Sequence, residues 1–300
     1  MLINIFAEIR KANAIVILTH QYPDGDAISS CLALKLWIGE KADIVIPSFP
    51  ESFSFLPHIE MIKKESKKEY DLAIALDCAN TKRLIGYDEY FRKAKKTVVI
   101  DHHITNEKYA DYNFVDAKAP ACTQILASIC DEEKITKDIA SCLLAGIISD
   151  TSGLLERNIT SKTFSLIAML SSKGADYKKI HASLMQNCTK EQFRLKQIVI
   201  SRVILKDSIA MSYLTEDDIL GNETVDHKYL LKEYQYIDGI EVVILFIEYS
   251  NGIKVSLRSE KVDVLRICKK FNGGGHKNSA GCIIQDTLAN AKNKILRELI

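Results

Sequence analysis

The chain has 300 residues, of which 47% are hydrophobic and 26% are charged, and its formal net charge is +1. This composition is typical of a soluble globular protein with one large or two medium domains. It excludes a globally basic nucleic-acid binder but leaves room for a local basic cleft. The N-terminus is interrupted by charged residues, and no apolar run approaches the roughly 20 residues that span a bilayer. We therefore expect a cytoplasmic protein.

The first part of the chain alternates short apolar runs with segments of helical periodicity. We expect buried strands over residues 14–18, 43–46, 72–76 and 98–100. We expect helices over residues 2–12, 27–38, 120–131, 137–149, 160–172 and 177–188, and a solvated helix face at the lysine-rich run 63–68. This alternation predicts an α/β domain with a doubly wound, mainly parallel sheet.

The periodicity changes after a charged stretch at residues 189–204, which we expect to be a helical connector. Strands are expected at 209–214, 240–249 and 253–258, with a hairpin turn at Asn251-Gly252. A helix at 262–271 precedes a glycine-rich segment, and a further strand and a helix at 288–299 close the chain. This part is expected to be a smaller α+β domain with a mixed or antiparallel sheet.

The eight cysteines lie mostly in apolar runs and form no CxxC pair. Such placement favours buried free thiols over disulfides or zinc sites. We therefore expect the cysteines to belong to the hydrophobic core.

Polar side chains follow three of the expected strands and one buried helix. The carboxyl ends of parallel strands meet at one edge of a sheet, where such folds bind their ligands. Each motif alone could be a cap, a turn or a core polar group, and Asp26 could be the N-cap of the helix behind it. A glycine between Asp24 and Asp26 would let this loop turn tightly. Together the motifs indicate one shared site made of His20, Asp24, Asp26, Asp77, Asp101, His102, His103 and Asp150.

Carboxylates and imidazoles without thiolates suit Mn²⁺, Mg²⁺ or Fe²⁺. Packing so many carboxylates together is electrostatically costly unless cations neutralise them. Six or more ligands are too many for one ion, so we expect a carboxylate-bridged pair roughly 3.5–4 Å apart, as in phosphatases and nucleases. Such a pair would activate water for attack on phosphorus.

The glycine run Gly273–Gly275 follows a helix and lacks the GK[ST] ending, so it is not a P-loop. It could be a flexible loop after the helix, or a bare backbone that lets a phosphate or base approach closely, with His276, Lys277 and Ser279 as donors. Arg258, on an expected strand, could bind a phosphate through two hydrogen bonds or could be a surface residue.

These motifs resemble those of the DHH phosphoesterases of the DHHA1 subfamily over nearly the whole chain. The length and two-domain layout are similar to the bacterial oligoribonuclease, or nano-RNase, branch. Members of that branch also dephosphorylate phosphoadenosine phosphate (pAp) or cleave short linear dinucleotides. The matching segments are His20–Asp26, Asp77–Asn80 with Arg83 nearby, Asp101–His103, Ser149–Thr151 and Gly273–Gly281.

The resemblance implies a role for each candidate residue. His20 and Asp24 would hold one manganese ion, Asp26, His102 and Asp150 would hold a second, and Asp77 would bridge the two; Mg²⁺ or another divalent ion could replace manganese. His103 would contact the scissile phosphate or assist proton transfer, and Asp101 would orient its neighbours. The smaller domain would bind the nucleotide through Arg258, Gly274, Gly275, His276 and Ser279.

The resemblance also divides the chain. Residues 1–188 would form the DHH metal-binding catalytic domain, 189–204 a helical linker, and 205–300 the DHHA1 nucleotide-binding domain. The chain departs from the family pattern where many members have glycine at Asn272, alanine at Ser279 and an acid at Asn80. None of these is an expected metal ligand, but they leave the substrate preference open.

We expect a manganese-dependent phosphohydrolase that acts on short single-stranded RNA, linear dinucleotides or pAp, without a membrane partner; the sequence leaves a homodimer open. One alternative is the same centre acting on a cyclic dinucleotide or, as an exonuclease, on a longer single strand. A more distant alternative is a non-catalytic nucleotide-binding protein that keeps the fold.

Overall fold

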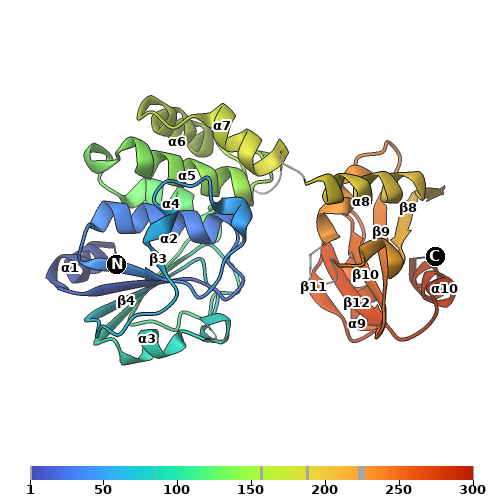
Figure 1. Ribbon diagram of the computed structural model, residues 1–300, viewed down its shortest axis with the longest axis horizontal. Coiled ribbons are helices and arrows are strands. Elements are labelled where there is room, and N and C mark those ends of the chain that lie inside the picture. The colour runs from blue at the N-terminus through green and yellow to red at the C-terminus, as the bar shows by residue number, and fades with distance from the viewer. Residues whose placement is uncertain (1, 85, 156–157, 187–188, 222–226, 300) are drawn as a thin grey trace. The chain divides into compact units, whose positions relative to one another are not determined.

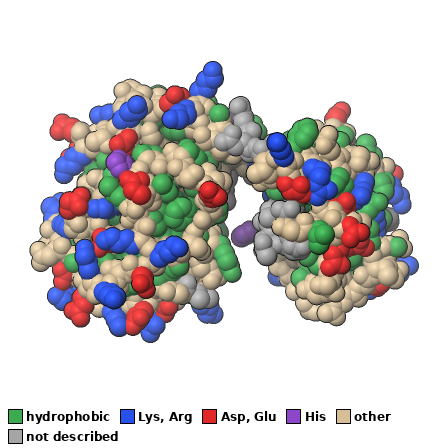
Figure 2. All heavy atoms as spheres, viewed as in Figure 1, with side chains coloured by type: hydrophobic (Ala, Val, Ile, Leu, Met, Phe, Trp, Pro, Cys, Tyr) green, Lys and Arg blue, Asp and Glu red, His purple; other side chains and the backbone are tan. Residues whose placement is uncertain are grey.

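The computed structural model describes residues 2–84, 86–155, 158–186, 189–221 and 227–299. It divides into two units, residues 1–187 and 188–300, each built around its own sheet (Figure 1). Figure 2 shows basic and acidic side chains intermixed over the visible face of each unit, in agreement with the net charge of +1. Within the described residues, no helix is both long enough and apolar enough to cross a membrane.

The sheet of the first unit has six strands in the order β3-β2-β1-β4-β5-β6, and all paired neighbours are parallel. The chain builds outward from β1 to β3 and then returns to place β4 on the other side of β1. This reversal makes the gap between β1 and β4 the topological switch point, where doubly wound sheets bind ligands. The strands are β1 (Ile15–Leu18), β2 (Ala42–Val45), β3 (Ile62–Lys63), β4 (Leu72–Leu76), β5 (Lys96–Asp101) and β6 (Tyr112–Val115).

Helices cover both faces of this sheet, which explains why its central strands are apolar at every position. Ile15 and Ile17 pack in one core cluster, whereas Val16 and Leu18 pack in another with Tyr87. Figure 1 shows α2, α4 and α5 together on one side of the sheet and α3 on the other. The helices are α1 (Leu2–Lys11), α2 (Gly25–Ile38), α3 (Asp88–Lys93), α4 (Cys122–Ile129), α5 (Lys137–Asp150), α6 (Ser161–Ser172) and α7 (Tyr177–His181), which continues into a π-helical turn (Ala182–Gln186).

Short 3₁₀ helices interrupt the loops of the first unit. They are η1 (Glu51–Phe53), η2 (Ile59–Met61), η3 (Thr81–Leu84) and η4 (Glu132–Lys134). Of the segment 177–188 expected to be one helix, residues 187–188 lie outside the described residues. The seven described cysteines are free thiols, and six of them are buried; Cys188 lies outside the described residues.

The second unit has a mixed six-stranded sheet in the order β11-β12-β10-β9-β8-β7, in which only the β8–β9 pair is parallel. Helices α9 (Val264–Lys269) and α10 (Leu288–Leu299) pack on one face. Helix α8 (Lys190–Ser201) and the 3₁₀ segment η7 (His227–Glu233) lie against the other. The strands are β7 (Ile204–Lys206), β8 (Ile209–Leu214), β9 (Val242–Tyr249), β10 (Gly252–Arg258), β11 (Gly274–His276) and β12 (Ser279–Ile284), and a further 3₁₀ helix is η6 (Asp217–Ile219).

Helix α8 lies in the stretch where the sequence predicted a connector. Its Leu195 and Val199 are buried in the same cluster as Val243 and Leu245 of β9. The helix is therefore packed on the second sheet and belongs to the second unit, residues 188–300.

The predicted helix face at residues 63–68 is wrong. Ile62 and Lys63 form the edge strand β3, and the residues after it have no helical structure. Lys63 Nζ and Lys68 Nζ lie 2.6 and 2.9 Å from the Asp43 carboxylate. These lysines therefore pair with Asp43 beside an edge strand, where charged side chains discourage pairing with a foreign strand.

Besides β3, the short strands β6, β7 and β11 were not predicted. Strand β6 is only partly buried along its length, so its pattern lacks the apolar signal of the central strands. Strand β11 overlaps the glycine run, for which the sequence left open a flexible loop or a bare backbone that a ligand approaches, and it pairs antiparallel with β12. For β11 the partner strand, and not local propensity, decides the conformation, because glycine is disfavoured in strands.

Helix α2 approaches α5 closely because glycines lie at the contact. A Cβ atom on Gly25 would lie 2.2 Å from Ser149 Oγ and 2.6 Å from Ser149 Cβ, and one on Gly146 would lie 2.7 Å from Asp26 Oδ1. The glycine between Asp24 and Asp26 is thus required by this close approach and not, as the sequence suggested, by a tight turn. It keeps the acidic loop next to the end of α5.

We expect Gly25→Ala to destabilise the protein by about 1–3 kcal/mol, because the added methyl group overpacks the α2–α5 contact. Ser149→Gly removes the two nearest obstructing atoms, so the double variant should recover part of the loss. Chemical denaturation of the four members of this double-mutant cycle measures the coupling. Gly274→Ala is the control, since its Cβ would meet no atom within 4 Å. Simple additivity of Gly25→Ala and Ser149→Gly would contradict the contact.

Candidate active site

The six residues expected to bind metal gather at the carboxyl edge of the first sheet. Three sets of side chains each offer ligand atoms that lie within 4.8 Å of one another. Asp77 and His102 each belong to two sets, so the three sets form one continuous cluster. The sets are His20, Asp24 and Asp77; Asp26, His102 and Asp150; and Asp77, Asp101, His102 and His103.

Asp77 lies at the centre of this cluster, directly after β4. One of its carboxylate oxygens, Oδ1, is 3.3 Å from His102 Nε2, and the other, Oδ2, is 3.8 Å from His20 Nε2. Its φ of 52° is in the left-handed region, which costs a non-glycine residue on the order of 1 kcal/mol or more. The two oxygens therefore face different histidines, as a bridging carboxylate requires.

Asp101, at the end of β5, is fully buried and orients its neighbours. Its Oδ1 accepts hydrogen bonds from the backbone N–H of His102 (2.8 Å) and from the Nδ1 side of the His103 ring (2.8 Å). Its Oδ2 accepts a hydrogen bond from Asn106 Nδ2 at 2.6 Å. Asp101 thereby fixes the His103 ring through Nδ1, and the His103 side chain is 26% exposed.

Asn106 is a residue that sequence reasoning missed. Besides Asp101, its Nδ2 contacts the backbone carbonyl of Cys78 at 3.2 Å. It thus connects the segment after β4 with the segment after β5. Its only signal in the sequence is its place three residues after His103, and no periodicity marks it.

A backbone contact to Nδ1, the ring nitrogen that faces away from the cluster, orients the His102 ring. Its Nδ1 lies 3.2 Å from the backbone carbonyl of Ala119, to which it can donate a proton. Its Nε2 then points to Asp77 and to Asp150, whose Oδ2 lies 3.4 Å away. Such a backbone partner sets the tautomer and the ring orientation of a histidine ligand.

The two carboxylates of the acidic loop have different structural roles. Asp24, which is exposed, caps α2 by accepting from the backbone N–H groups of Asp26 and Ala27. Asp26 is buried and accepts from the backbone N–H groups of Cys122 (2.6 Å) and Thr123 (3.0 Å) and from Thr123 Oγ1 (2.6 Å). The sequence-based suggestion that Asp26 is the N-cap of its own helix is therefore wrong: Asp26 holds the start of α4.

Burial and the charges of neighbouring side chains shift the pKa values of the residues in the cluster. Burial, followed by the nearby charges of Asp77 and Asp150, raises the pKa of Asp26 well above its usual range. Burial alone would lower the pKa of His102, but the adjacent Asp77 outweighs it and raises that pKa to about 10. Burial would likewise raise the pKa of Asp77, but the imidazoles of His102 and His20 hold it below its usual range. Without a cation, protons therefore neutralise the cluster.

The donor set fits a divalent cation. Asp77 Oδ1 is a buried carboxylate oxygen that accepts no hydrogen bond from the residues described by the structure. Carboxylate and imidazole ligands without a thiolate are those that Mn²⁺ and Mg²⁺ sites use. A cation beside Asp77 would offset the repulsion between the neighbouring carboxylates, which protons offset when no cation is bound.

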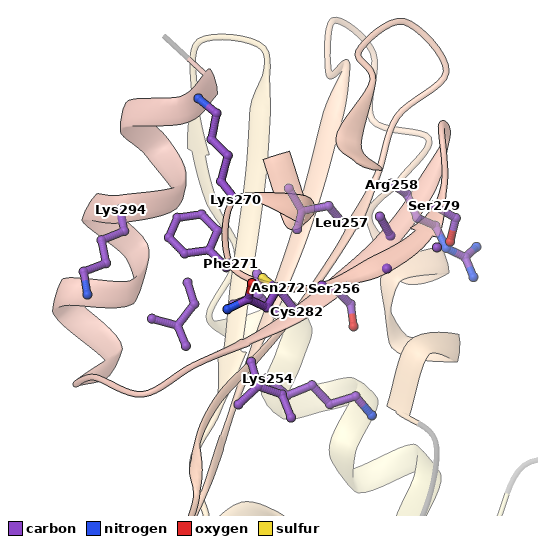
Figure 3. Close-up of a pocket in the computed structure, with 18 of the residues that line it drawn as sticks. Lys254, Ser256, Leu257, Arg258, Lys270, Phe271, Asn272, Ser279, Cys282 and Lys294 are labelled. Atoms are coloured by element: carbon purple, nitrogen blue, oxygen red, sulfur yellow. The ribbon is translucent and has the colours of Figure 1, made fainter. Parts of the chain in front are cut away.

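The second unit carries a pocket of about 960 Å³ formed by β10, β12 and the segment after α9 (Figure 3). Four of the five residues expected to bind the nucleotide line it: Arg258, Gly274, Gly275 and Ser279. His276 is exposed on β11 and is not part of the lining. Sequence reasoning missed Lys254 and Phe271, which also line the pocket.

Asn272, at a position where the family resemblance led us to expect glycine, also lines the pocket. Its φ is 56°, in the left-handed region. Asparagine is one of the few residues with a side chain that adopt this conformation routinely, so the departure from glycine preserves the backbone path.

Two family models match the chain: the DHH family, N-terminal domain, over residues 14–147, and the DHHA1 domain, over residues 212–300. The bifunctional oligoribonuclease and PAP phosphatase NrnA of Thermus thermophilus is 31% identical over 93% of this chain and 87% of its own. The chain belongs to the DHH family. The NrnA protein of Bacillus subtilis is 27% identical, covering 91% of this chain and 90% of its own.

A solved structure confirms the fold of this DHH protein. The crystal structure of an exopolyphosphatase-related protein from Bacteroides fragilis matches with a TM-score of 0.90 at 23% identity, covering 99% of this chain and 94% of that one. The pocket of the second unit lies in the DHHA1 domain. The DHH match includes five of the six expected metal ligands, and Asp150 lies just beyond its end.

We expect Mn²⁺ binding to the metal-free DHH protein to release protons at pH 7.5. His102, whose pKa is about 10, is protonated there and must lose its proton to act as a ligand. The apparent affinity should therefore rise with pH, by up to about tenfold per unit for each proton displaced. Calorimetry in buffers of different ionisation enthalpy counts the protons. Asp43→Asn, at a carboxylate outside the cluster, is the control, and a pH-independent affinity would contradict the coupling.

Proposed function

We propose that this DHH protein is a metal-dependent phosphohydrolase that acts on short oligoribonucleotides, linear dinucleotides or pAp. The observation that carries the proposal is the gathering of five other expected carboxylate and imidazole ligands around Asp77 at the topological switch point. The NrnA proteins of Thermus thermophilus and Bacillus subtilis, named as oligoribonuclease and PAP phosphatase, indicate the substrate class.

The proposed metal ligands fall into two groups that share Asp77. His20 and Asp24 would hold one Mn²⁺ ion, and Asp26, His102 and Asp150 would hold the other; Mg²⁺ fits the same donors. Bound there, the cations would activate a water molecule for attack on phosphorus and neutralise the phosphoryl oxygens. The three hydrogen bonds of Asp26 to α4 occupy both lone pairs of Oδ1 and one of Oδ2, so one lone pair of Oδ2 is left for this purpose.

His103 is the residue we propose to act on the scissile phosphate. Asp101 holds its Nδ1 at 2.8 Å, which leaves Nε2 as the ring atom that can meet the phosphate. An imidazole held in this way can donate a hydrogen bond to a phosphoryl oxygen or a proton to the leaving oxygen. Asp101 would then be a positioning residue, supported by Asn106.

In the DHHA1 domain, we propose that Arg258, Gly274, Gly275, His276 and Ser279 bind the nucleotide. Arg258 supports this assignment, because its Nε is buried without a hydrogen-bond partner among the described residues. Its Nη1 makes one long contact, 3.4 Å, to Gln235 Oε1. A phosphate would satisfy a guanidinium that the protein leaves largely unpaired.

A substrate panel in Mn²⁺ tests the proposal: ribonucleotides of two to five residues, a long single strand, pAp and cyclic dinucleotides. We expect the wild-type protein to hydrolyse the short substrates or pAp fastest. We expect Asp77→Asn to lower kcat by about three orders of magnitude, because the isosteric amide cannot supply a bridging negative charge. Asp43→Asn, which removes a buried carboxylate of the same sheet outside the cluster, should retain kcat within about twofold.

Nucleotide binding without hydrolysis under Mn²⁺ would contradict the enzymatic proposal, and undiminished turnover by Asp77→Asn would contradict the bridging role. Faster turnover of a cyclic dinucleotide, or of the long strand, would assign this centre to that substrate instead.

A further inference from the structure

Two cysteines meet in the layer between helix α9 and the sheet of the second unit. Val264, Ile267 and Cys268 form the buried face of α9, at helical spacings of three and four residues. On β12 buried side chains alternate with more exposed ones, and Cys282 lies on the buried face. Both cysteines belong to the same core cluster, so the helix and the strand direct their thiols into one layer.

Gly273 leaves the space beside the two cysteines free of another side chain. Its backbone N–H donates to the Cys268 carbonyl oxygen at 2.9 Å. A Cβ atom added to Gly273 would lie 2.6 Å from Cys282 Cβ and 2.9 Å from that same carbonyl oxygen. The backbone of Cys268 and the side chain of Cys282 therefore lie close together, as a disulfide requires.

The two thiols interact directly. A hydrogen bond between them lowers the pKa of Cys268 and raises that of Cys282. The pair therefore releases its first proton more readily than an isolated thiol does, and the thiolate is the reactive form of cysteine. Cys142 in α5 shows the opposite behaviour, because burial raises its pKa and keeps it a thiol.

A small oxidant can reach the pair from the pocket of the second unit. Cys282 lines this pocket (Figure 3) and is 5% exposed, whereas Cys268 is fully buried. Hydrogen peroxide is little larger than water, so it fits a site that excludes bulky reagents. The position of the pair thus favours peroxide over a larger disulfide reagent as its oxidant.

We propose that Cys268 and Cys282 form a reversible disulfide when the protein meets hydrogen peroxide. The Cys268 thiolate attacks one peroxide oxygen, the O–O bond breaks, and the leaving hydroxide takes up a proton from solvent to become water. Cys268 is then a sulfenic acid. The Cys282 sulfur attacks the Cys268 sulfur and loses its proton, so that the S–S bond forms and a second water leaves. The two thiols supply the two electrons that reduce the peroxide.

The disulfide would close a loop over residues 269–281. This segment contains β11 and four of the five residues that we propose to bind the nucleotide. A cross-link at both ends of the segment restricts its conformational freedom. The inference is independent of the proposed function, because the thiols react whether or not the protein hydrolyses a substrate.

Peptide mapping by mass spectrometry tests the site in the full-length chain. After peroxide treatment we expect a peptide pair that links Cys268 to Cys282 and is lighter by two hydrogen atoms, formed before Cys142 is modified. Dithiothreitol should restore both thiols. Cys268→Ala and Cys282→Ala should each abolish the linked pair. Cys142→Ala, the matched control at another buried cysteine, should leave it unchanged.

Hydrogen exchange of the wild-type protein tests the constraint without any substitution. In the oxidised form, backbone amides of residues 269–281 should exchange about tenfold more slowly than in the reduced form. Absence of the linked pair at every peroxide concentration that leaves the protein folded would overturn the inference. A different cysteine pairing, or irreversible oxidation of Cys268 without a link, would overturn it as well. Equal exchange in the linked and reduced forms would contradict the restriction of the loop.

Discussion

The mutual repulsion of buried carboxylates at one edge of a parallel sheet is the constraint on which this site depends. Asp26 and Asp77 are almost completely buried, and Asp150 approaches the same histidine as Asp77. Like charges so close together in a poorly solvated site raise one another's proton affinity. The cluster must therefore hold protons or cations. Because its carboxylates and imidazoles share one centre, a metal cation that binds there can displace the protons.

The surrounding fold acts mainly to hold this repulsive cluster together. Gly25 lets α2 approach the end of α5, and Asp26 holds the start of α4, so three helices meet behind the ligands. The Ala119 carbonyl fixes His102, and Asn106 ties Asp101 to the segment after β4. Removing any of these contacts would let charged groups separate, which is why non-ligand residues belong to the same functional unit.

The sequence predicted the parts of the molecule whose signal is local. Strands β1 and β4 are uninterrupted apolar runs that end in His20 and Asp77, so both the strands and their ligands could be recognised. The parts that failed depend on distant partners. β11 is a strand only because β12 pairs with it. Lys63 and Lys68 take their positions from ion pairs with Asp43. Asp26 binds the start of a helix that lies 96 residues further along the chain. No local pattern encodes Asn106 or the close approach that requires Gly25.

The central claim is that Asp77 joins two divalent cations, and crystals grown with MnCl₂ test it most directly. In an anomalous difference map recorded near the manganese absorption edge, the account predicts two peaks on either side of the Asp77 carboxylate. One should lie beside His20 and Asp24, and the other beside Asp26, His102 and Asp150. A map without density next to Asp77, or with manganese bound only elsewhere on the protein, would contradict the account.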